Sequence, residues 1–171
     1  PPPLPPTMCH ADCPQSLDET DMWEDAWRSV HNTWSEMSYQ DACDTAANRD
    51  IPPAVNVSGA EGWNGVNTSW TIFYGDAGRR LPTAPPGFKR CGTQNTGWLA
   101  TPHPPLGAAP RDGVVCFQTG DDRSLFCSVT APIRMCACSY DGGASVTYAY
   151  RFTSPWACPS AFCATDVGLD S

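Results

Sequence analysis

The sequence predicts a small, disulfide-rich, mainly β domain with long irregular loops, preceded by a polyproline II segment. Three observations support this fold class: ten cysteines spread over the chain, short β-like runs in its C-terminal half, and a proline run at its start. A chain of 171 residues suits one domain with a short appendage. We expect a proline-rich extended stalk or linker over residues 1–8, a cysteine-rich domain over 9–165 and a tail over 166–171.

The chain opens on PPPLPPT, from Pro1 to Thr7. Because proline fixes φ and lacks a backbone N–H, this run is expected to be extended polyproline II. It is either a stiff spacer or a stalk that carries hydroxyl groups and sugars; the candidate positions for hydroxylation or O-glycosylation are Pro1, Pro2, Pro3, Pro5 and Pro6. No signal peptide is visible and the first residue is proline, so we interpret the chain as a mature or excised piece of a longer protein.

A tryptophan-rich span follows, from Glu19 to Ser38. Its large apolar residues are spaced by four, three, four and three positions: Trp23, Trp27, Val30, Trp34 and Met37. This is the period of an amphipathic helix, and Ser16 and Glu19 ahead of it resemble a capping box. The span is therefore predicted to be helical, with its tryptophans packed rather than arranged as a sugar platform.

The C-terminal half has the pattern of short strands. Residues 50–67 are rich in Pro, Gly and Asn and are expected to form a loop. Five runs then predict strands: Trp70–Tyr74, Gly113–Phe117, Ser124–Val129, Ile133–Cys138 and Ser145–Phe152. In the last run Val146, Tyr148, Tyr150 and Phe152 alternate with Thr147, Ala149 and Arg151, which predicts two distinct faces. Turns are expected at Asp121-Asp122 and at Asp141-Gly142-Gly143.

The charge balance excludes some partners. The chain carries 18 acidic and 10 basic residues, a formal net charge of -8. Nucleic acids and anionic lipid surfaces both require a basic face, so neither is expected as a partner. No apolar run approaches the ~20 residues of a membrane-spanning helix.

The cysteines indicate an oxidising compartment. They occupy an even set of positions: 9, 13, 43, 91, 116, 127, 136, 138, 158 and 163. An even, high count is typical of a disulfide framework in an extracellular protein. Five bridges at roughly 2–4 kcal/mol each would supply much of the stability that a small core lacks.

Metal and catalytic chemistry are poorly supported. The pairs Cys9–Cys13 and Cys136–Cys138 lack the spacing of a zinc knuckle. Cys91 and His103 are close in sequence, but a nucleophilic thiolate must be free and an even cysteine count leaves none over. No G-x-S-x-G elbow occurs. We therefore expect neither an enzyme nor a cofactor.

Two asparagines lie in glycosylation sequons. These are Asn56 in Asn56-Val57-Ser58 and Asn67 in Asn67-Thr68-Ser69, neither with proline in the middle. If both carry sugar, the two glycans would lie close together on one side of the domain.

The cysteines and aromatic stretches together resemble a known family, the eight-cysteine domain of uromodulin and pancreatic glycoprotein 2. The resemblance covers roughly Cys13 to Cys163, and it lies in an ordered set rather than in any one element. The stretches are LDE at 17–19, WRS at 27–29, ACD at 42–44, GW at 62–63, RCGT at 90–93, WL at 98–99, HP at 103–104, GVV before Cys116, FC at 126–127, IRMC at 133–136, YAY at 148–150 and PWACPSAFC at 155–163.

The resemblance implies a disulfide pattern. It pairs Cys13–Cys136, Cys43–Cys158, Cys91–Cys163 and Cys116–Cys127; the cysteines outside the family pattern, Cys9 and Cys138, then pair with each other. Two family cysteines, one before RCGT and one beside Cys127, are missing here. The alternative in which Cys9 and Cys13 exchange partners stays open. The resemblance also implies that Trp98 and His103 pack rather than react.

The function that the resemblance implies is that of a non-catalytic extracellular module. We expect a structural or adhesive role in a cell-surface or fibrous assembly, with N-glycans presented next to a proline-rich stalk. Expected partners are other extracellular glycoproteins or copies of the chain itself, covalent glycans and lectins. One alternative is a carbohydrate- or protein-binding module using exposed Trp23, Trp34 or Trp156. The other is a secreted hydrolase, which needs two facing carboxylates with raised pKa values.

Overall fold

The fold is a single curved sheet. The structure is a computed structural model that describes residues 6–24, 28–31, 69–153 and 160–166. Its strands are β1 (Thr20–Trp23), β2 (Trp70–Phe73), β3 (Asn95–Leu99), β4 (Arg111–Gln118), β5 (Val129–Cys138), β6 (Thr147–Arg151) and β7 (Ser160–Phe162). Short 3-10 turns, η1 (Leu17–Glu19), η3 (Gly75–Ala77) and η4 (Arg123–Leu125), connect them. Within these described residues no helix is long and apolar enough to cross a membrane.

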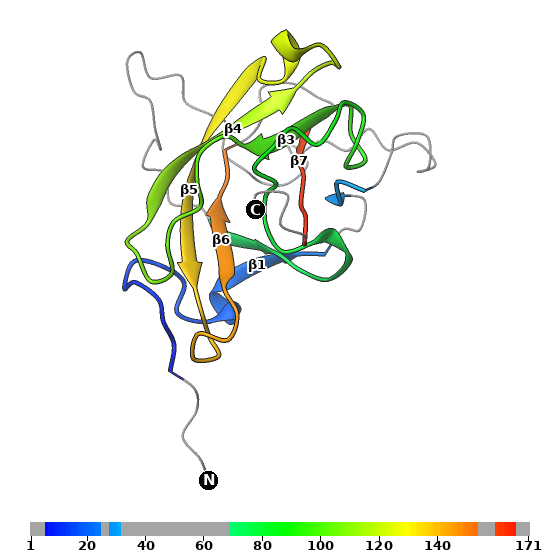
Figure 1. The fold of residues 1–171 in the computed structure, drawn as a ribbon. Helices are drawn as coiled ribbons and strands as arrows, with labels where there is room; N and C mark the ends of the chain where they lie inside the picture. The colour runs from blue at the N-terminus through cyan, green and yellow to red at the C-terminus, as the bar shows by residue number, and fades with distance from the viewer. Residues whose placement is uncertain (1–5, 25–27, 32–68, 154–159, 167–171) are drawn as a thin grey trace.

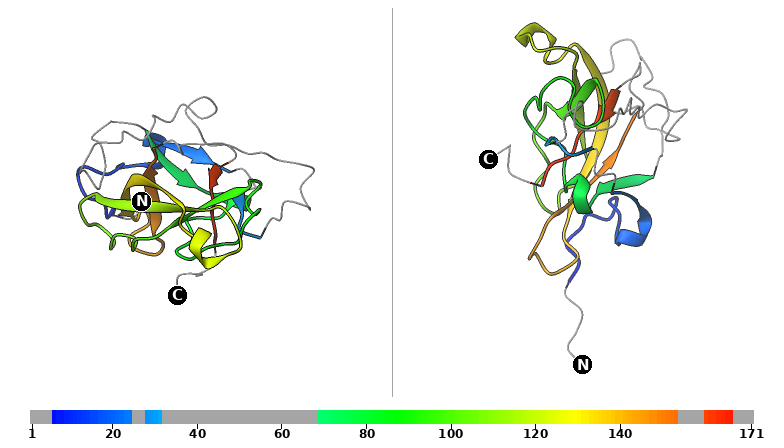
Figure 2. Two further views of the ribbon diagram at one scale, coloured as in Figure 1. Left: turned by 90° about the horizontal axis from the view of Figure 1, so that it is seen from above. Right: turned by 90° about the vertical axis from the view of Figure 1, so that its right-hand side faces the viewer.

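The strand order across the sheet is β1-β2-β6-β5-β4-β3-β7 (Figure 1). The central strands are antiparallel, while the outermost pairs, β1 with β2 and β3 with β7, are parallel. The sheet curls so that its two ends approach each other (Figure 2). Phe152, just after β6, stacks on Trp23 of β1 at 5.3 Å and on Phe162 of β7 at 4.0 Å. The result is a half-barrel in which aromatic packing joins the two ends of the sheet.

The alternation predicted for residues 145–152 sorts the side chains of the sheet. Tyr150 and Phe152 belong to the larger core, on what we call the inner face, together with Phe73, Ala77, Leu81, Leu99, Val115, Phe117, Ala131, Ile133, Met135, Phe162 and Ala164. Ala149 belongs to a second cluster on the opposite, outer face, with Cys13, Trp70, Ile72, Cys136 and Cys138. Val146, predicted to share the inner side, is 37% exposed at the start of this run.

The predicted helix over Glu19–Ser38 is wrong where the span is described. Thr20–Trp23 form β1, which pairs with β2 in parallel from Thr20↔Trp70 to Trp23↔Phe73. Ser29 forms an isolated bridge with Ala164. Trp23 packs at 6.0 Å from Phe73, its strand partner, so non-local pairing outweighs the helical spacing. Trp27, Trp34 and Met37 lie outside the described residues.

The predicted strand over Ser124–Val129 is also wrong. This run forms η4 and the rest of the connection between β4 and β5, and β5 begins only at Val129. Asp122 caps η4 by accepting a hydrogen bond from the Ser124 backbone N–H at 2.9 Å. The disulfide Cys116–Cys127 spans only 11 residues, so the chain must turn back on itself here. The expected turns at Asp121-Asp122 and Asp141-Gly142-Gly143 lie outside the strands, and both glycines have positive φ.

Candidate functional site

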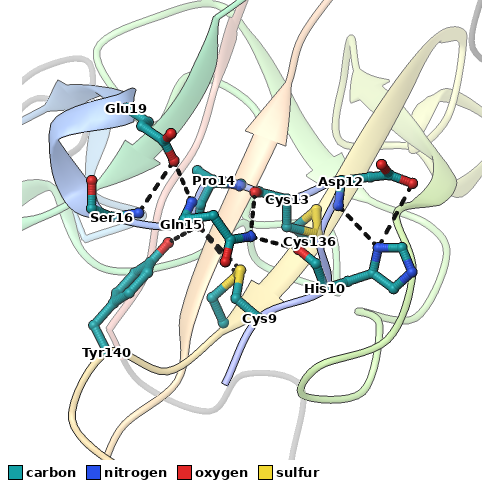
Figure 3. Close-up of a disulfide and its surroundings, with 11 residues drawn as sticks. Cys9, His10, Asp12, Cys13, Pro14, Gln15, Ser16, Glu19, Cys136 and Tyr140 are labelled. Carbon is teal, nitrogen blue, oxygen red and sulfur yellow. Dashed lines mark hydrogen bonds and ion pairs between the residues drawn. A yellow bond between two sulfur atoms is a disulfide. The ribbon is translucent and has the colours of Figure 1, made fainter. Parts of the chain in front are cut away.

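The segment after the proline run is joined to the sheet by two neighbouring disulfides, which we call the double staple. Cys9 bonds to Cys138. Cys13 bonds to Cys136, as Figure 3 shows. Cys136 and Cys138 are two positions apart on β5, so both project from its outer face. Cys9 and Cys13 are four positions apart, and the chain turns at Ala11 and Asp12 between them, so both cysteines reach the two strand positions.

Hydrogen bonds make the stapled loop compact. The Gln15 side-chain amide donates to the carbonyls of His10 at 2.8 Å and Cys13 at 2.9 Å. The Glu19 carboxylate accepts from the Gln15 backbone N–H and, at 3.3 Å, from that of Ser16 (Figure 3). The Ser16–Glu19 capping box predicted for a helix therefore exists, but it caps the single 3-10 turn η1.

Tyr140 covers the staple from the β5–β6 turn. Its hydroxyl donates to the Pro14 carbonyl at 2.6 Å, which ties the stapled loop to the turn (Figure 3). Burial, with a smaller effect of the Glu19 carboxylate, raises the pKa of Tyr140 to about 12. The phenol therefore keeps its proton at neutral pH and remains a hydrogen-bond donor.

The end of the proline run reaches the same turn. Met8 and Ser139 exchange backbone hydrogen bonds of 2.8 and 2.9 Å, and the Gly142 N–H donates to the Pro6 carbonyl at 3.2 Å. The stapled segment lies beside the β5–β6 turn, and the β4–β5 connection lies at the opposite end of the sheet (Figures 1 and 2). Pro1, Pro2, Pro3 and Pro5 lie outside the described residues.

The RCGT segment is covalently anchored. Cys91 bonds to Cys163, and both are fully buried. The chain turns sharply at this point, since Lys89, Cys91 and Gly92 all have positive φ. In β3, a Cβ on Gly97 would lie 2.8 Å from the Phe117 ring, so glycine is required for this strand to approach the core.

Trp98 and His103 make packing contacts. The Trp98 indole N–H donates to the Phe126 carbonyl at 2.8 Å. The His103 ring lies 4.3 Å from the Tyr148 ring at a tilt of 42°, and its Nε2 lies 2.7 Å from the Tyr150 hydroxyl. That hydroxyl also accepts from the Leu81 backbone N–H at 3.0 Å. His103 is thus held by the Tyr148 ring and the Tyr150 hydroxyl, within the fold rather than aimed at a substrate.

We expect Tyr150→Phe to reduce the free energy of unfolding by about 1–3 kcal/mol, because the buried Leu81 N–H loses its acceptor. Urea unfolding with all disulfides intact measures this loss. Tyr148→Phe is the matched control: it keeps the ring that packs against His103, and its expected change is within about 0.5 kcal/mol. Equal losses in the two variants would contradict the role given to the Tyr150 hydroxyl.

The described residues give little support to metal or hydrolytic chemistry. The sulfur atoms of Cys9, Cys13 and Cys138 lie within 4.8 Å of one another, but each is held in a disulfide and offers no thiolate. Hydrogen bonds, first from the Ser145 side chain, lower the pKa of Asp141 to about 2. The Ser124 backbone and side chain lower the pKa of Asp122 as well. Both carboxyl pKa values are lowered, whereas a carboxylic acid that acts as a general acid needs a raised pKa.

The other candidate residues divide into described and undescribed ones. Trp23 is half-buried, with its ring against Phe152 and the Arg28 guanidinium carbon 4.1 Å from its centroid, so it serves in packing. The remaining candidates lie outside the described residues: Trp34, Trp156, Asn56, Asn67 and the pair Cys43–Cys158. The structure thus contains four of the five disulfides that the resemblance implies, in the same pairs, and no cysteine in the described part is free.

Sequence reasoning missed two groups of residues. The sequence pattern places Tyr150 only on one face of a strand. An inward tyrosine also needs a hydrogen-bond partner for its hydroxyl, and a histidine can be that partner. Arg134 and Arg151 were not singled out, yet they are direct cross-strand partners on β5 and β6. The signal for the arginines was their place at outward positions of two adjacent strands.

Comparison with known protein families identifies a match for this chain. The model of the uromodulin-like family of eight-cysteine domains matches residues 71–164, which is more than half of the chain. It spans β2 to the residues just after β7, including Cys91, Cys116, Cys127, Cys136, Cys138 and Cys163. The search of curated proteins finds no match.

Proposed function

Since this chain belongs to the family of uromodulin-like eight-cysteine domains, we propose that it is a structural or adhesive module of a cell-surface or fibrous assembly. The family consists of non-catalytic extracellular modules, and the disulfides fit an oxidising compartment. In this proposal the domain presents N-glycans on Asn56 and Asn67 beside a proline-rich stalk. Its partners are lectins, other extracellular glycoproteins or further copies of the chain.

The double staple is the observation that carries this proposal. A proline run is extended and stiff, so tension along a stalk reaches the domain where the run ends. Cys9 and Cys13 follow that point and are covalently bonded to one central strand. Backbone hydrogen bonds of Pro6 and Met8 hold the same junction. A load applied to the stalk would then pass into β5 through covalent bonds rather than through packing alone.

Glycopeptide mass spectrometry of the native, non-reduced protein tests the glycan part of the proposal. We expect sugar on Asn56 or Asn67 and an extracellular, fully oxidised chain. Ser58→Ala and Ser69→Ala remove the sequons while keeping both asparagines, and they should abolish the glycans and lectin binding. Asn32→Gln is the control, because Asn32 lies in no sequon and its loss should change neither. Bare asparagines in the native protein would overturn glycan presentation.

Single-molecule pulling tests the mechanical part. With the chain tethered through the proline run and its C-terminus, we expect the intact staple to prevent extension of residues 9–138, which its two bridges enclose. The quadruple variant C9A/C13A/C136A/C138A should extend further, by the part of that segment before Cys91 that the remaining bridges, Cys91–Cys163 among them, do not enclose. Equal extension of the two proteins would overturn the structural role.

A further inference from the structure

Four strands place one residue each in a row across the outer face of the sheet. Arg134 of β5 is the register partner of both Arg151 of β6 and Asp112 of β4. The β2–β6 register brings Trp70 beside Arg151. The row therefore runs Trp70, Arg151, Arg134, Asp112.

The two ends of the row hold the two guanidinium groups in place. Arg134 Nε donates to Asp112 Oδ1 at 2.9 Å. The Arg151 guanidinium carbon lies 4.3 Å from the centroid of the Trp70 ring, and Trp70 is almost fully buried. Each arginine thus contacts a fixed partner at its own end of the row: Trp70 for Arg151 and Asp112 for Arg134. The two guanidinium groups are neighbours in the middle of the row.

Two like charges on directly opposite residues destabilise a sheet unless something offsets them. Burial is the largest cause that lowers the pKa of Arg151, and the positive charge of Arg134 lowers it further. An anion between the two guanidinium groups would turn the repulsion into two favourable contacts.

A surface pocket of about 470 Å³ opens over these arginines. Its walls are Asp12 from the stapled loop and Ala109 and Pro110 from the connection before β4. The Asp12 carboxylate is largely exposed and lies 3.8 Å from His10 Nδ1, on the rim of the pocket. The volume lies in the range of small-ligand sites and is far larger than a bare inorganic anion needs.

We propose that this pocket binds the oxyanion of an acidic sugar, either a carboxylate or a sulfate ester, between Arg134 and Arg151. Planar guanidinium groups match such oxyanions with paired hydrogen bonds. Ala109 and Pro110 supply an apolar wall for the C–H groups of a pyranose ring. The net charge of -8 disfavours binding of polyanions to the chain, so a ligand with a single oxyanion is the better candidate. This site is separate from the structural role proposed above and does not depend on it.

Calorimetric titration of the disulfide-intact chain tests the proposal. The probes are N-acetylglucosamine 6-sulfate, N-acetylneuraminic acid, neutral N-acetylglucosamine and inorganic sulfate, all at constant ionic strength. We expect at least one acidic sugar to bind with a Kd of about 1 mM or tighter, and the neutral sugar to show no binding. Which acidic sugar binds identifies the oxyanion as sulfate ester or carboxylate.

Single substitutions locate the site. Arg134→Gln and Arg151→Gln should each weaken binding by about tenfold or more. Arg151→Lys should also weaken it, because lysine keeps the charge but loses the planar fork. Arg123→Gln is the matched control: it removes the same charge from exposed η4, outside the pocket, and should change the Kd by less than about twofold. Arg134 is about one-third exposed, so its variant tests the site even if Arg151→Gln does not fold.

Three results would overturn the proposal. The first is no heat of binding from either acidic sugar. The second is unchanged binding by Arg134→Gln. The third is inorganic sulfate that binds as tightly as the sugars, which would mean that the pocket recognises a bare ion.

Discussion

Replacing Phe152 with alanine is expected to lower the free energy of unfolding by about 3–5 kcal/mol. Phe152 is almost fully buried and lies where the two ends of the curled sheet meet. Its ring stacks on three others: Trp23 at 5.3 Å, Tyr150 at 5.5 Å and Phe162 at 4.0 Å. Alanine would leave a cavity bounded by rigid rings from separate strands, which collapse poorly around it.

Urea unfolding under non-reducing conditions measures this loss. Val146→Ala is the control, because Val146 belongs to the same sequence run but is 37% exposed; its expected change is within about 0.5 kcal/mol. The slope of the unfolding free energy against urea should stay the same in both variants. A loss below about 1 kcal/mol for Phe152→Ala would show that the half-barrel is closed by something other than this stack.

The C-terminal alternation made part of this core predictable. Tyr148, Tyr150 and Phe152 alternate with Ala149 and Arg151 in the sequence, and a strand with that pattern separates the two sets whatever its neighbours are. The mainly β class and the family were predictable for the same reason, since both follow from local patterns and cysteine order. The match of the uromodulin-like family model over residues 71–164 confirms the family.

Strands β1, β3 and β7 were not predictable from the sequence. β1 and β7 have only four and three residues, and each pairs in parallel with a strand far away in the chain. Such pairing leaves no local signal, and at β1 the tryptophan spacing imitates a helix. β3 contains Gly97, whose presence lowers strand propensity although the close approach to Phe117 requires it.

The candidate sites, too, were predictable from the sequence only in part. In the double staple, the pair Cys13–Cys136 followed from family resemblance, because cysteine order carries over between relatives. Cys9–Cys138 was expected only because these two cysteines lie outside the family pattern and remained to pair with each other. The Arg134–Arg151 pair was not predictable, because it depends on the β5–β6 register, and a shift of one residue would place the two arginines on opposite faces. Register is set by the whole sheet, so no short motif could reveal this contact.

Removing the Cys91–Cys163 bridge is expected to cost about 4 kcal/mol of unfolding free energy. The bridge joins residues 72 positions apart, so its loss releases a large loop in the unfolded chain. Both cysteines are fully buried, and Cys163 directly follows β7, whose three residues pair with β3. Without the bridge, β7 would depend on that short ladder and on the stacking of Phe162.

The matched comparison is C91A/C163A against C116A/C127A, since each variant removes one disulfide and two sulfur atoms. The Cys116–Cys127 loop has a separation of only 11 residues, and Cys127 is exposed in the β4–β5 connection. Chain entropy gives that bridge about 3 kcal/mol, so C91A/C163A should be the less stable variant by at least about 1 kcal/mol. Urea unfolding gives the difference, and non-reducing peptide mapping verifies that the remaining bridges are unchanged. The reverse order of stability would mean that β7 is held by its ladder and aromatic contacts, and that the cysteine of the RCGT segment contributes little to the fold.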